Sequence, residues 1–277
     1  MNNWMLPGIY TFRGHQVRYG ATGDGPPIVL IHGTPFSSYE WRRIVPCLAK
    51  HRRVYYFDLL GYGQSDQNGV SDVSLGVQNE LLADLLDHWQ LEAPDVIAHD
   101  FGGTTALRCH LLNGREYRSL TLIDPVALSP WGSQFSSQVR ANVDVFRTLP
   151  ATIHEAVVRA YIRSAHTRAM ADEDMAEYVR PWVGEIGQAA FYEQISQFDR
   201  RYTDEVEAKY SCVRCPTLIL WGEADQWLHI ESGQRLKGMI PGAQFQSVPN
   251  AGHLMHEDAP EAIVGAAIDF LKDISMQ

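Results

Sequence analysis

Asp100 carries the side chain whose type and position best suit nucleophilic chemistry in this chain. It lies within residues 96–103, with the sequence VIAHDFGG, where an apolar run leads into a segment of helical period. Small residues, Ala98 and Gly102, flank it two positions away on each side, which suits the sharp and crowded turn of a nucleophile elbow. A carboxylate in that position can attack an electrophilic carbon and form a covalent ester. The competing interpretation is that Asp100 only caps the helix that follows.

His253 is the candidate base that would activate water against such an ester. It follows the apolar run 244–248 in a loop with the sequence PNAGHLMH, close to the expected edge of a sheet. His256 is the weaker candidate, because it would begin the final helical segment.

Two aspartates compete for the role of orienting that base and stabilising its charge. Asp225 follows the end of the apolar run 217–221, and Asp124 ends the run 120–123. We favour Asp225, because Asp124 precedes Pro125 and is readily explained as a turn residue.

An oxyanion hole is expected from two backbone amides. The sequence His32-Gly33-Thr34-Pro35 closes the apolar run 28–31, and Pro35 has no N–H to donate. The N–H of Thr34 and the N–H of Phe101, directly after the nucleophile, are therefore the expected donors. These donors occur together with a nucleophile, an acid and a base in that order along the chain, which makes the combined motif a specific signal.

These residues follow short apolar runs that alternate with stretches of helical period, which predicts a mostly parallel sheet with helices on both faces, an α/β fold. The helical segments are clearest at residues 74–89 and 104–112. The expected strands span residues 28–31, 54–57, 95–98, 120–123, 217–221 and, more weakly, 244–248.

The alternation stops between about residues 127 and 210, where charged helical segments follow one another without a convincing strand. We therefore expect a core formed by residues 1–127 and 209–277, with a helical cap inserted at residues 128–208.

Composition limits the partners of the protein. The 277 residues include 23 Lys and Arg against 33 Asp and Glu, a formal net charge of −10, which disfavours nucleic acids and anionic membranes. No apolar run is long enough to span a bilayer, and residues 1–4 do not begin a leader of basic then apolar character. We expect a cytoplasmic protein, monomeric or homodimeric, that acts on a small neutral molecule.

No metal site or cofactor is expected from the motifs. The 11 histidines show no His-Glu-x-x-His spacing, and residues 61–63 lack the glycine spacing of a phosphate loop. Cys212 and Cys215 form a Cys-x-x-Cys pair, which is best interpreted as the approach to the strand at 217–221.

With these residues the chain resembles the α/β-hydrolase fold superfamily, and within it the haloalkane dehalogenases, haloacetate dehalogenases and epoxide hydrolases that use an aspartate nucleophile. Residues 32–42 (HGTPFSSYEWR) and 58–66 (DLLGYGQSD) are most similar to the dehalogenases. His99-Asp100 followed by an aromatic residue suits dehalogenases and epoxide hydrolases alike. The resemblance implies that Asp100 forms an alkyl ester, which His253 and Asp225 hydrolyse.

The leaving-group site departs from each of these relatives. Many haloalkane dehalogenases hold the halide with Trp directly after the nucleophile and with Asn or Trp elsewhere, whereas this chain has Phe101 and Thr34 there. Haloacetate dehalogenases place arginines around the elbow, but positions 101 and 104 here are Phe101 and Thr104, so a carboxylate substrate is disfavoured. Epoxide hydrolases use two cap tyrosines, for which Tyr192 is the candidate and Tyr161 a weak substitute.

Residues expected to contact the substrate are His32 and His99 from the core and Trp131, Trp182 and Tyr192 from the cap. The two cap tryptophans could donate an indole N–H to a halide, although packing alone would explain them. Haloalkane dehalogenation ranks marginally first on the motifs at 32–42 and 58–66, with epoxide hydrolysis as the alternative. A hydrolase of another substrate class, a cofactor-independent oxygenase and a ligand receptor remain open on the same fold.

Overall fold

A single eight-stranded sheet organises the molecule, in the order β1-β2-β4-β3-β5-β6-β7-β8. The computed structural model describes residues 4–275. Residues 1–3, which belong to the N-terminal stretch where no leader is expected from the sequence, lie outside the described residues. β1 pairs antiparallel with β2, and β2 with β4, while all other neighbours are parallel. The strands are β1 Gly8–Phe12, β2 His15–Thr22, β3 Pro27–Ile31, β4 Arg53–Phe57, β5 Asp95–His99, β6 Ser119–Ile123, β7 Thr217–Gly222 and β8 Gln244–Val248.

All six expected strands are present, and the expected α/β fold with a mostly parallel sheet is confirmed. Every residue of β5, β6 and β7 is buried, as a central parallel strand covered on both faces requires. The sequence analysis missed β1 and β2, the antiparallel hairpin at one edge, in which buried and exposed residues are mixed.

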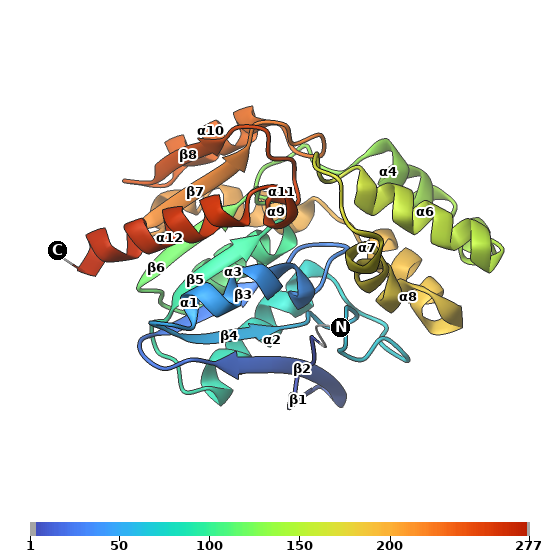
Figure 1. Ribbon diagram of the computed structural model, residues 1–277, viewed down its shortest axis with the longest axis horizontal. Coiled ribbons are helices and arrows are strands. Elements are labelled where there is room, and N and C mark those ends of the chain that lie inside the picture. Colours follow the sequence, from blue (N-terminus) through green and yellow to red (C-terminus); the bar gives the residue numbers. More distant parts are fainter. Residues whose placement is uncertain (1–3, 276–277) are drawn as a thin grey trace.

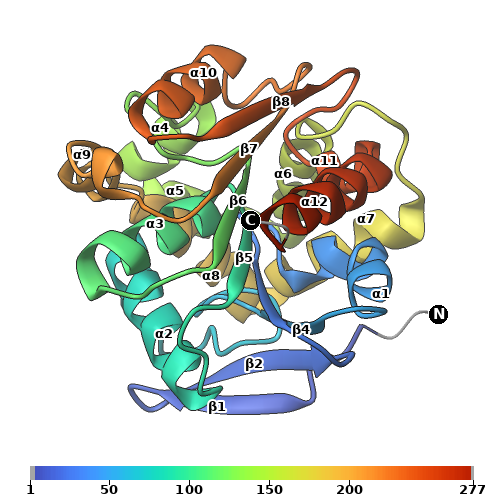
Figure 2. The same ribbon diagram turned by 90° about the vertical axis from the view of Figure 1, so that its left-hand side faces the viewer.

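Helices cover both faces of the sheet (Figure 2). The helices α1 (Val45–Leu48) and α12 (Pro260–Ser275) lie on one face, and α2 (Leu75–His88) and α3 (Phe101–Asn113) lie on the other. The helix α10 (Ile230–Met239) packs against β7 and β8, and the short α11 (Met255–Asp258) precedes α12. A 3-10 helix, η1 (Ser38–Arg43), follows β3 and contacts α11. Two separate apolar clusters fill the space between the sheet and these layers.

Only helical segments connect β6 to β7. They are α4 Gln134–Ala141, α5 Val143–Arg147, α6 Ala151–Arg163, α7 Asp172–Val179, η2 Arg180–Trp182, α8 Gly184–Ser196, α9 Arg201–Glu207 and η3 Tyr210–Cys212. Figure 1 shows α4, α6, α7 and α8 grouped beyond one end of the sheet, whereas α9 lies beside α3 of the core layer. Among residues 4–275, no helix has the length and apolar character needed to cross a membrane.

Candidate active site

Asp100 occupies the turn between β5 and α3, in a backbone conformation with φ of 48° that costs a non-glycine residue about 1–3 kcal/mol. Hydrogen bonds hold this turn: the N–H of Asp100 donates to the carbonyl of Ile123, and its own carbonyl accepts from the N–H of Val126. The neighbouring chain comes so close that a Cβ at Gly102 would lie 2.4 Å from the carbonyl oxygen of Ile31. The glycine at position 102 of the predicted elbow is therefore sterically required.

The carboxylate of Asp100 is held by a backbone donor from the loop after β3. The N–H of Thr34 donates to Oδ1 of Asp100 over 2.8 Å. Gly33 permits this approach, because a Cβ at that position would lie 2.5 Å from the Cβ of Asp100. The amide of Thr34 thus stands where it would stabilise negative charge on that oxygen.

His253 lies between two carboxylates at the carboxyl ends of the strands. Its Nδ1 is 2.9 Å from Oδ2 of Asp225, and its Nε2 is 3.3 Å from Oδ2 of Asp100. The other oxygen of Asp225 accepts the backbone N–H groups of Trp227 and Leu228 at 2.7 and 3.0 Å. Asp225 therefore has a fixed orientation, and it directs the imidazole toward Asp100.

The electrostatic environment favours the protonated form of His253 when both carboxylates are charged. Burial lowers the pKa of His253, but the charges of Asp225 and Asp100 and the contacts of its two ring nitrogens with these carboxylates raise it, and the pKa lies well above the usual value. Loss of either negative charge would lower this pKa, and the neutral imidazole could then accept a proton.

Asp124, the competing acid, is close to this group without contacting the imidazole by a hydrogen bond. Its Oδ1 accepts the N–H of Gly222 at 2.9 Å, and its Oδ2 has no hydrogen-bond partner. Burial and the neighbouring charge of Asp225 raise its pKa well above the usual value. The geometry supports Asp225 as the partner of His253, because Asp124 bonds Gly222 and makes no hydrogen bond to the imidazole.

A cavity of about 40 Å³ borders the nucleophile. Its lining includes Thr34, Asp100 and Phe101 from the core and Trp131, Tyr161 and Phe198 from the insertion, and no Lys or Arg among the described residues lines it. Apolar groups predominate, so the cavity suits a small substrate without charge.

Tyr161 brings a phenol into this cavity, although the sequence analysis ranked it as a weak substitute. Its ring stacks on Trp227 with centroids 4.5 Å apart, and Ser133 lines the same cavity. Burial, followed by the charge of Asp100, raises the pKa of Tyr161. The phenol is therefore protonated at neutral pH and close enough to Asp100 to interact with its charge.

The indole donors around the cavity are all engaged by protein acceptors. Trp131 donates its indole N–H to Oγ1 of Thr203 over 2.9 Å, and Trp182 donates to the carbonyl of Pro35 over 2.7 Å. Trp227 donates to Oγ of Ser164 over 2.9 Å. In this conformation the indole N–H groups of Trp131 and Trp182 have protein acceptors, and either would have to leave its acceptor to hold a halide, as the sequence analysis expected.

Three further expected substrate contacts lie behind the cavity lining. His32 donates from Nδ1 to the carbonyl of Gly33 and accepts the N–H of Leu59, so its ring shapes the loop after β3. The phenol of Tyr192 hydrogen-bonds Nδ1 of His154 over 3.0 Å, away from Asp100. Both ring nitrogens of His99 bond within the protein. The polar atoms of His32, His99 and Tyr192 thus have partners within the protein, and a contact of these residues with the substrate stays a prediction.

Gln194, on the cap-side helix α8, was missed by the sequence analysis. Its Oε1 accepts hydrogen bonds from the hydroxyls of Thr34 and Tyr62 at 2.8 and 3.0 Å. The contact joins the insertion to the loop that holds Asp100. No local sequence signal distinguishes a glutamine in this role from one on a helix surface.

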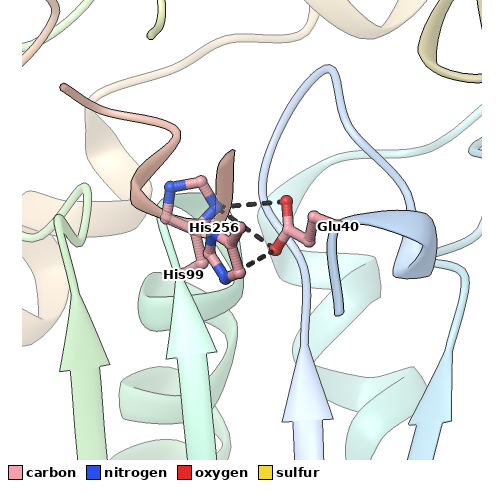
Figure 3. A group of neighbouring side chains, drawn as sticks. All are labelled: Glu40, His99 and His256. Atoms are coloured by element: carbon pink, nitrogen blue, oxygen red, sulfur yellow. Dashed lines mark hydrogen bonds and ion pairs between the residues drawn. The ribbon is translucent and has the colours of Figure 1, made fainter. Parts of the chain in front are cut away.

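Beside the site, a buried group consists of Glu40, His99 and His256 (Figure 3). Potential ligand atoms of the three side chains all lie within 4.8 Å of one another, a spacing that by itself would accommodate a small cation. The hydrogen bonds of His99 already occupy both of its nitrogens, and they account for its position without an ion. Cys212 and Cys215 are free thiols.

Comparison with known proteins gives consistent results over nearly the whole chain. A solved alpha/beta hydrolase fold protein from Burkholderia ambifaria has a TM-score of 0.93 and 49% sequence identity, with 95% of this chain and 97% of that chain covered. The chain is 26% identical to haloalkane dehalogenase 2 of Mycobacterium tuberculosis, over 95% of this chain and 96% of that protein. It is 27% identical to a soluble epoxide hydrolase of Corynebacterium sp. (strain C12), over 93% of this chain and 94% of that protein. The family model described as the alpha/beta hydrolase fold matches residues 26–260, and the chain belongs to that family.

Proposed function

We propose that this protein hydrolyses small, largely apolar alkyl electrophiles through a covalent ester on Asp100. The observation that carries the proposal is the position of the Asp100 carboxylate, with Oδ1 bound by the N–H of Thr34 and Oδ2 facing Nε2 of His253. A serine in that position would form an acyl intermediate with a carbonyl substrate, whereas a carboxylate displaces a leaving group from saturated carbon.

The first step forms a bond between Oδ2 of Asp100 and the electrophilic carbon, while the bond from that carbon to its leaving group breaks. In the second step, His253 removes a proton from water, and the resulting hydroxide adds to the carboxyl carbon of Asp100. The N–H of Thr34 stabilises the negative charge that develops on Oδ1. Collapse of this intermediate breaks the ester bond, and the protonated His253 returns its proton to the departing alkoxide, which leaves as an alcohol. Asp100 then loses the proton of the added hydroxide and is again a carboxylate. Phe101 supplies the second backbone amide of the oxyanion hole in this proposal.

An oxygen leaving group fits the cavity better than a halide, so we propose epoxide opening ahead of carbon–halogen cleavage. Tyr161 offers a phenolic proton within the cavity, whereas Trp131 and Trp227 direct their indole N–H groups to Thr203 and Ser164. The charge of Asp100, which raises the pKa of Tyr161, disappears as the ester forms. The phenol therefore becomes more acidic at the stage at which the opening ring needs a proton. Tyr192, the expected donor, is replaced by Tyr161 in this role.

Haloalkane dehalogenation is the second candidate. It is favoured by the similarity to haloalkane dehalogenase 2, which extends over 95% of this chain. A haloacetate is disfavoured, because no cationic side chain lines the cavity among residues 4–275. The cavity volume of about 40 Å³ restricts either substrate to a few heavy atoms unless the helical insertion moves.

Pairs of substrates with one carbon skeleton test the leaving group. We would compare propylene oxide with 1-bromopropane, and cyclohexene oxide with bromocyclohexane, by gas chromatography of the products and by assay of released bromide. Diol formation without bromide release supports the epoxide proposal, and bromide release with propanol formation supports the second candidate. Turnover of neither pair by folded protein would contradict both, and oxygen uptake with a substrate would indicate an oxygenase.

A further inference from the structure

The backbone carbonyl of His253 is bound by a side chain that belongs to neither the nucleophile nor the acid. Nε2 of His99 lies 3.0 Å from this oxygen, and Nδ1 of His99 lies 3.2 Å from both carboxyl oxygens of Glu40. Figure 3 shows Glu40 reaching from η1 toward His99, at the end of β5, and His256, from α11. All of these side chains are completely buried.

The donors and acceptors in this chain of contacts can be assigned from chemistry. A carbonyl oxygen carries no proton, so Nε2–H of His99 donates to His253. Nδ1 of His99 is then either a lone pair that accepts from a protonated Glu40 or a second N–H of an imidazolium facing a carboxylate. Burial raises the pKa of Glu40 well above its usual value and lowers the pKa of His99 to about 3. Both directions favour the neutral arrangement, in which Glu40 donates to His99.

His256 also lies next to Glu40, but it does not take the place of His99 as the hydrogen-bond partner of Glu40. Its Nε2 is 3.7 Å from Oε1 of Glu40, longer than a hydrogen bond, and its ring packs edge-on against Trp41 with centroids 4.4 Å apart. Burial lowers the pKa of His256 well below its usual value, so it adds no positive charge next to Glu40.

We propose that Glu40 is a positioning residue for His253, acting through His99 on the His253 backbone. This inference rests on the ester mechanism proposed above. The flanking residues are held independently, because Gly252 donates to Asp258 over 2.7 Å and Leu254 donates to the carbonyl of Ala165 over 2.7 Å. His99 fixes the peptide of the base itself, and through it the direction of Nε2 toward the ester.

The two chemical steps should therefore respond differently to the loss of Glu40. Asp100 is oriented by the N–H of Thr34 and by the bonds of its own peptide to β6 and Val126, none of which involves Glu40. Formation of the ester depends on that orientation. Hydrolysis of the ester depends in addition on the position of His253, and a misplaced base slows such a step by about 10- to 100-fold.

Glu40→Met removes the donor with little change in length, and Glu40→Gln is the matched control, because its amide N–H can still donate to His99. We would measure both steps in single turnovers with cyclohexene oxide or bromocyclohexane, whichever the wild type consumes, by rapid quench and intact mass. The expected result for Glu40→Met is ester formation within about threefold of wild type and ester hydrolysis slowed by about tenfold or more. Glu40→Gln should hydrolyse the ester within about threefold of wild type.

Several outcomes would overturn the proposal. Equal slowing of both steps in Glu40→Met would indicate a general structural role, and unchanged hydrolysis would show that the contact is not needed. Equal losses in Glu40→Gln and Glu40→Met would show that a carboxylate is required. One equivalent of zinc in purified wild type, lost in both variants, would assign the group to a metal instead. The variant His253→Gln tests the proposed function separately from the role of Glu40. If this variant forms no adduct on Asp100, the proposed function itself fails.

If Glu40→Met cannot be purified in folded form, the wild-type protein still decides the question. Nitrogen NMR of the histidine rings distinguishes protonated from unprotonated Nδ1, with His99→Gln for assignment. An unprotonated Nδ1 and a protonated Nε2 on His99 across the active pH range support the proposal. A doubly protonated His99 contradicts it.

Discussion

Nε2 of His253 lies 3.3 Å from Oδ2 of Asp100, although 153 positions separate the two residues in sequence. The same imidazole bonds Asp225 through its other nitrogen. In the proposed mechanism the Asp100 carboxyl group becomes the ester. His253 would then activate a water molecule that replaces its contact with Asp100, next to the carbon that the water must attack.

The pKa of His253 should depend on the charge of Asp100. Asp100→Asn removes one of the two negative charges that raise this pKa, so the pKa should fall relative to wild type. The imidazolium stabilises the folded protein fully below about pH 6.5, and this contribution is lost as the pH rises through the raised folded pKa. In Asp100→Asn that loss should occur at lower pH. NMR titration of the His253 ring and unfolding at several pH values test both points, and an identical pKa in the two proteins would contradict the assignment.

Asp225 and Asp124 should differ sharply on conversion to Asn. Asp225→Asn removes the acceptor that orients His253, and hydrolysis of the ester should fall by a factor on the order of 10⁴. Asp124 makes no hydrogen bond to His253, and its raised pKa favours the neutral form, which an amide of the same shape resembles, so activity of Asp124→Asn should stay close to wild type. Measurement of kcat for the two variants decides between them. Equal losses would show that both carboxyl groups serve the base.

Asp124→Asn should also change how stability depends on pH. The folded pKa of Asp124 is raised, so its favourable contribution is present at acidic pH and is lost as the pH rises toward the folded value. Asparagine has no such titration. The variant should gain Tm relative to wild type as the pH increases from about 4 to 8, and a constant difference across that range would be inconsistent with a buried neutral acid.

Tyr161→Phe tests the proton donor, with Tyr192→Phe as its matched control. Removal of the cavity phenol should slow epoxide opening by about 100-fold or more, while the ring still stacks on Trp227. Tyr192→Phe loses a hydrogen bond to His154 outside the cavity, so it should lower stability by about 1 kcal/mol and leave the rate unchanged. Rapid-quench rates of ester formation provide the comparison. A larger loss of rate in Tyr192→Phe would restore Tyr192 as the donor.

Arg42, Glu257 and Tyr178 form a buried polar link between η1, α11 and the inserted helix α7. Arg42 pairs with Glu257, and the phenol of Tyr178 donates to Glu257 over 2.7 Å. Glu257→Met leaves both groups without this acceptor and should lower the free energy of unfolding by roughly 3 kcal/mol. The exposed pair Arg115–Asp87 is the control, since Asp87→Ala should cost less than about 1 kcal/mol. Urea unfolding measures both, and equal effects would show that burial of the link adds nothing.

The parallel strands of the sheet and the three candidate residues that follow them could be predicted from sequence, because both depend on local patterns. The apolar runs gave six strands, and Asp100, Asp225 and His253 each follow one of them. Strands β1 and β2 escaped, because an edge hairpin buries only part of each strand and its apolar periodicity is weak.

The substrate side of the site could not be predicted in the same way. Whether Tyr161 or Tyr192 faces Asp100 depends on the rotation of α6 and α8, which tertiary packing determines. The indole of Trp131 was an apparent halide donor until Thr203, 72 residues away in sequence, proved to be its acceptor. Such partnerships have no signal in a single sequence.

Trapping of the ester tests the central claim most directly. His253→Gln removes the base while Asp100 keeps its bond to Thr34, so the protein should stop at the covalent intermediate. The variant would be incubated with the paired epoxides and bromides, and then analysed by intact mass and peptide mapping. We predict an adduct on Asp100 that carries the whole mass of the epoxide; an adduct of the alkyl group alone would instead indicate loss of bromide. Folded protein without any adduct on Asp100 would contradict the mechanism.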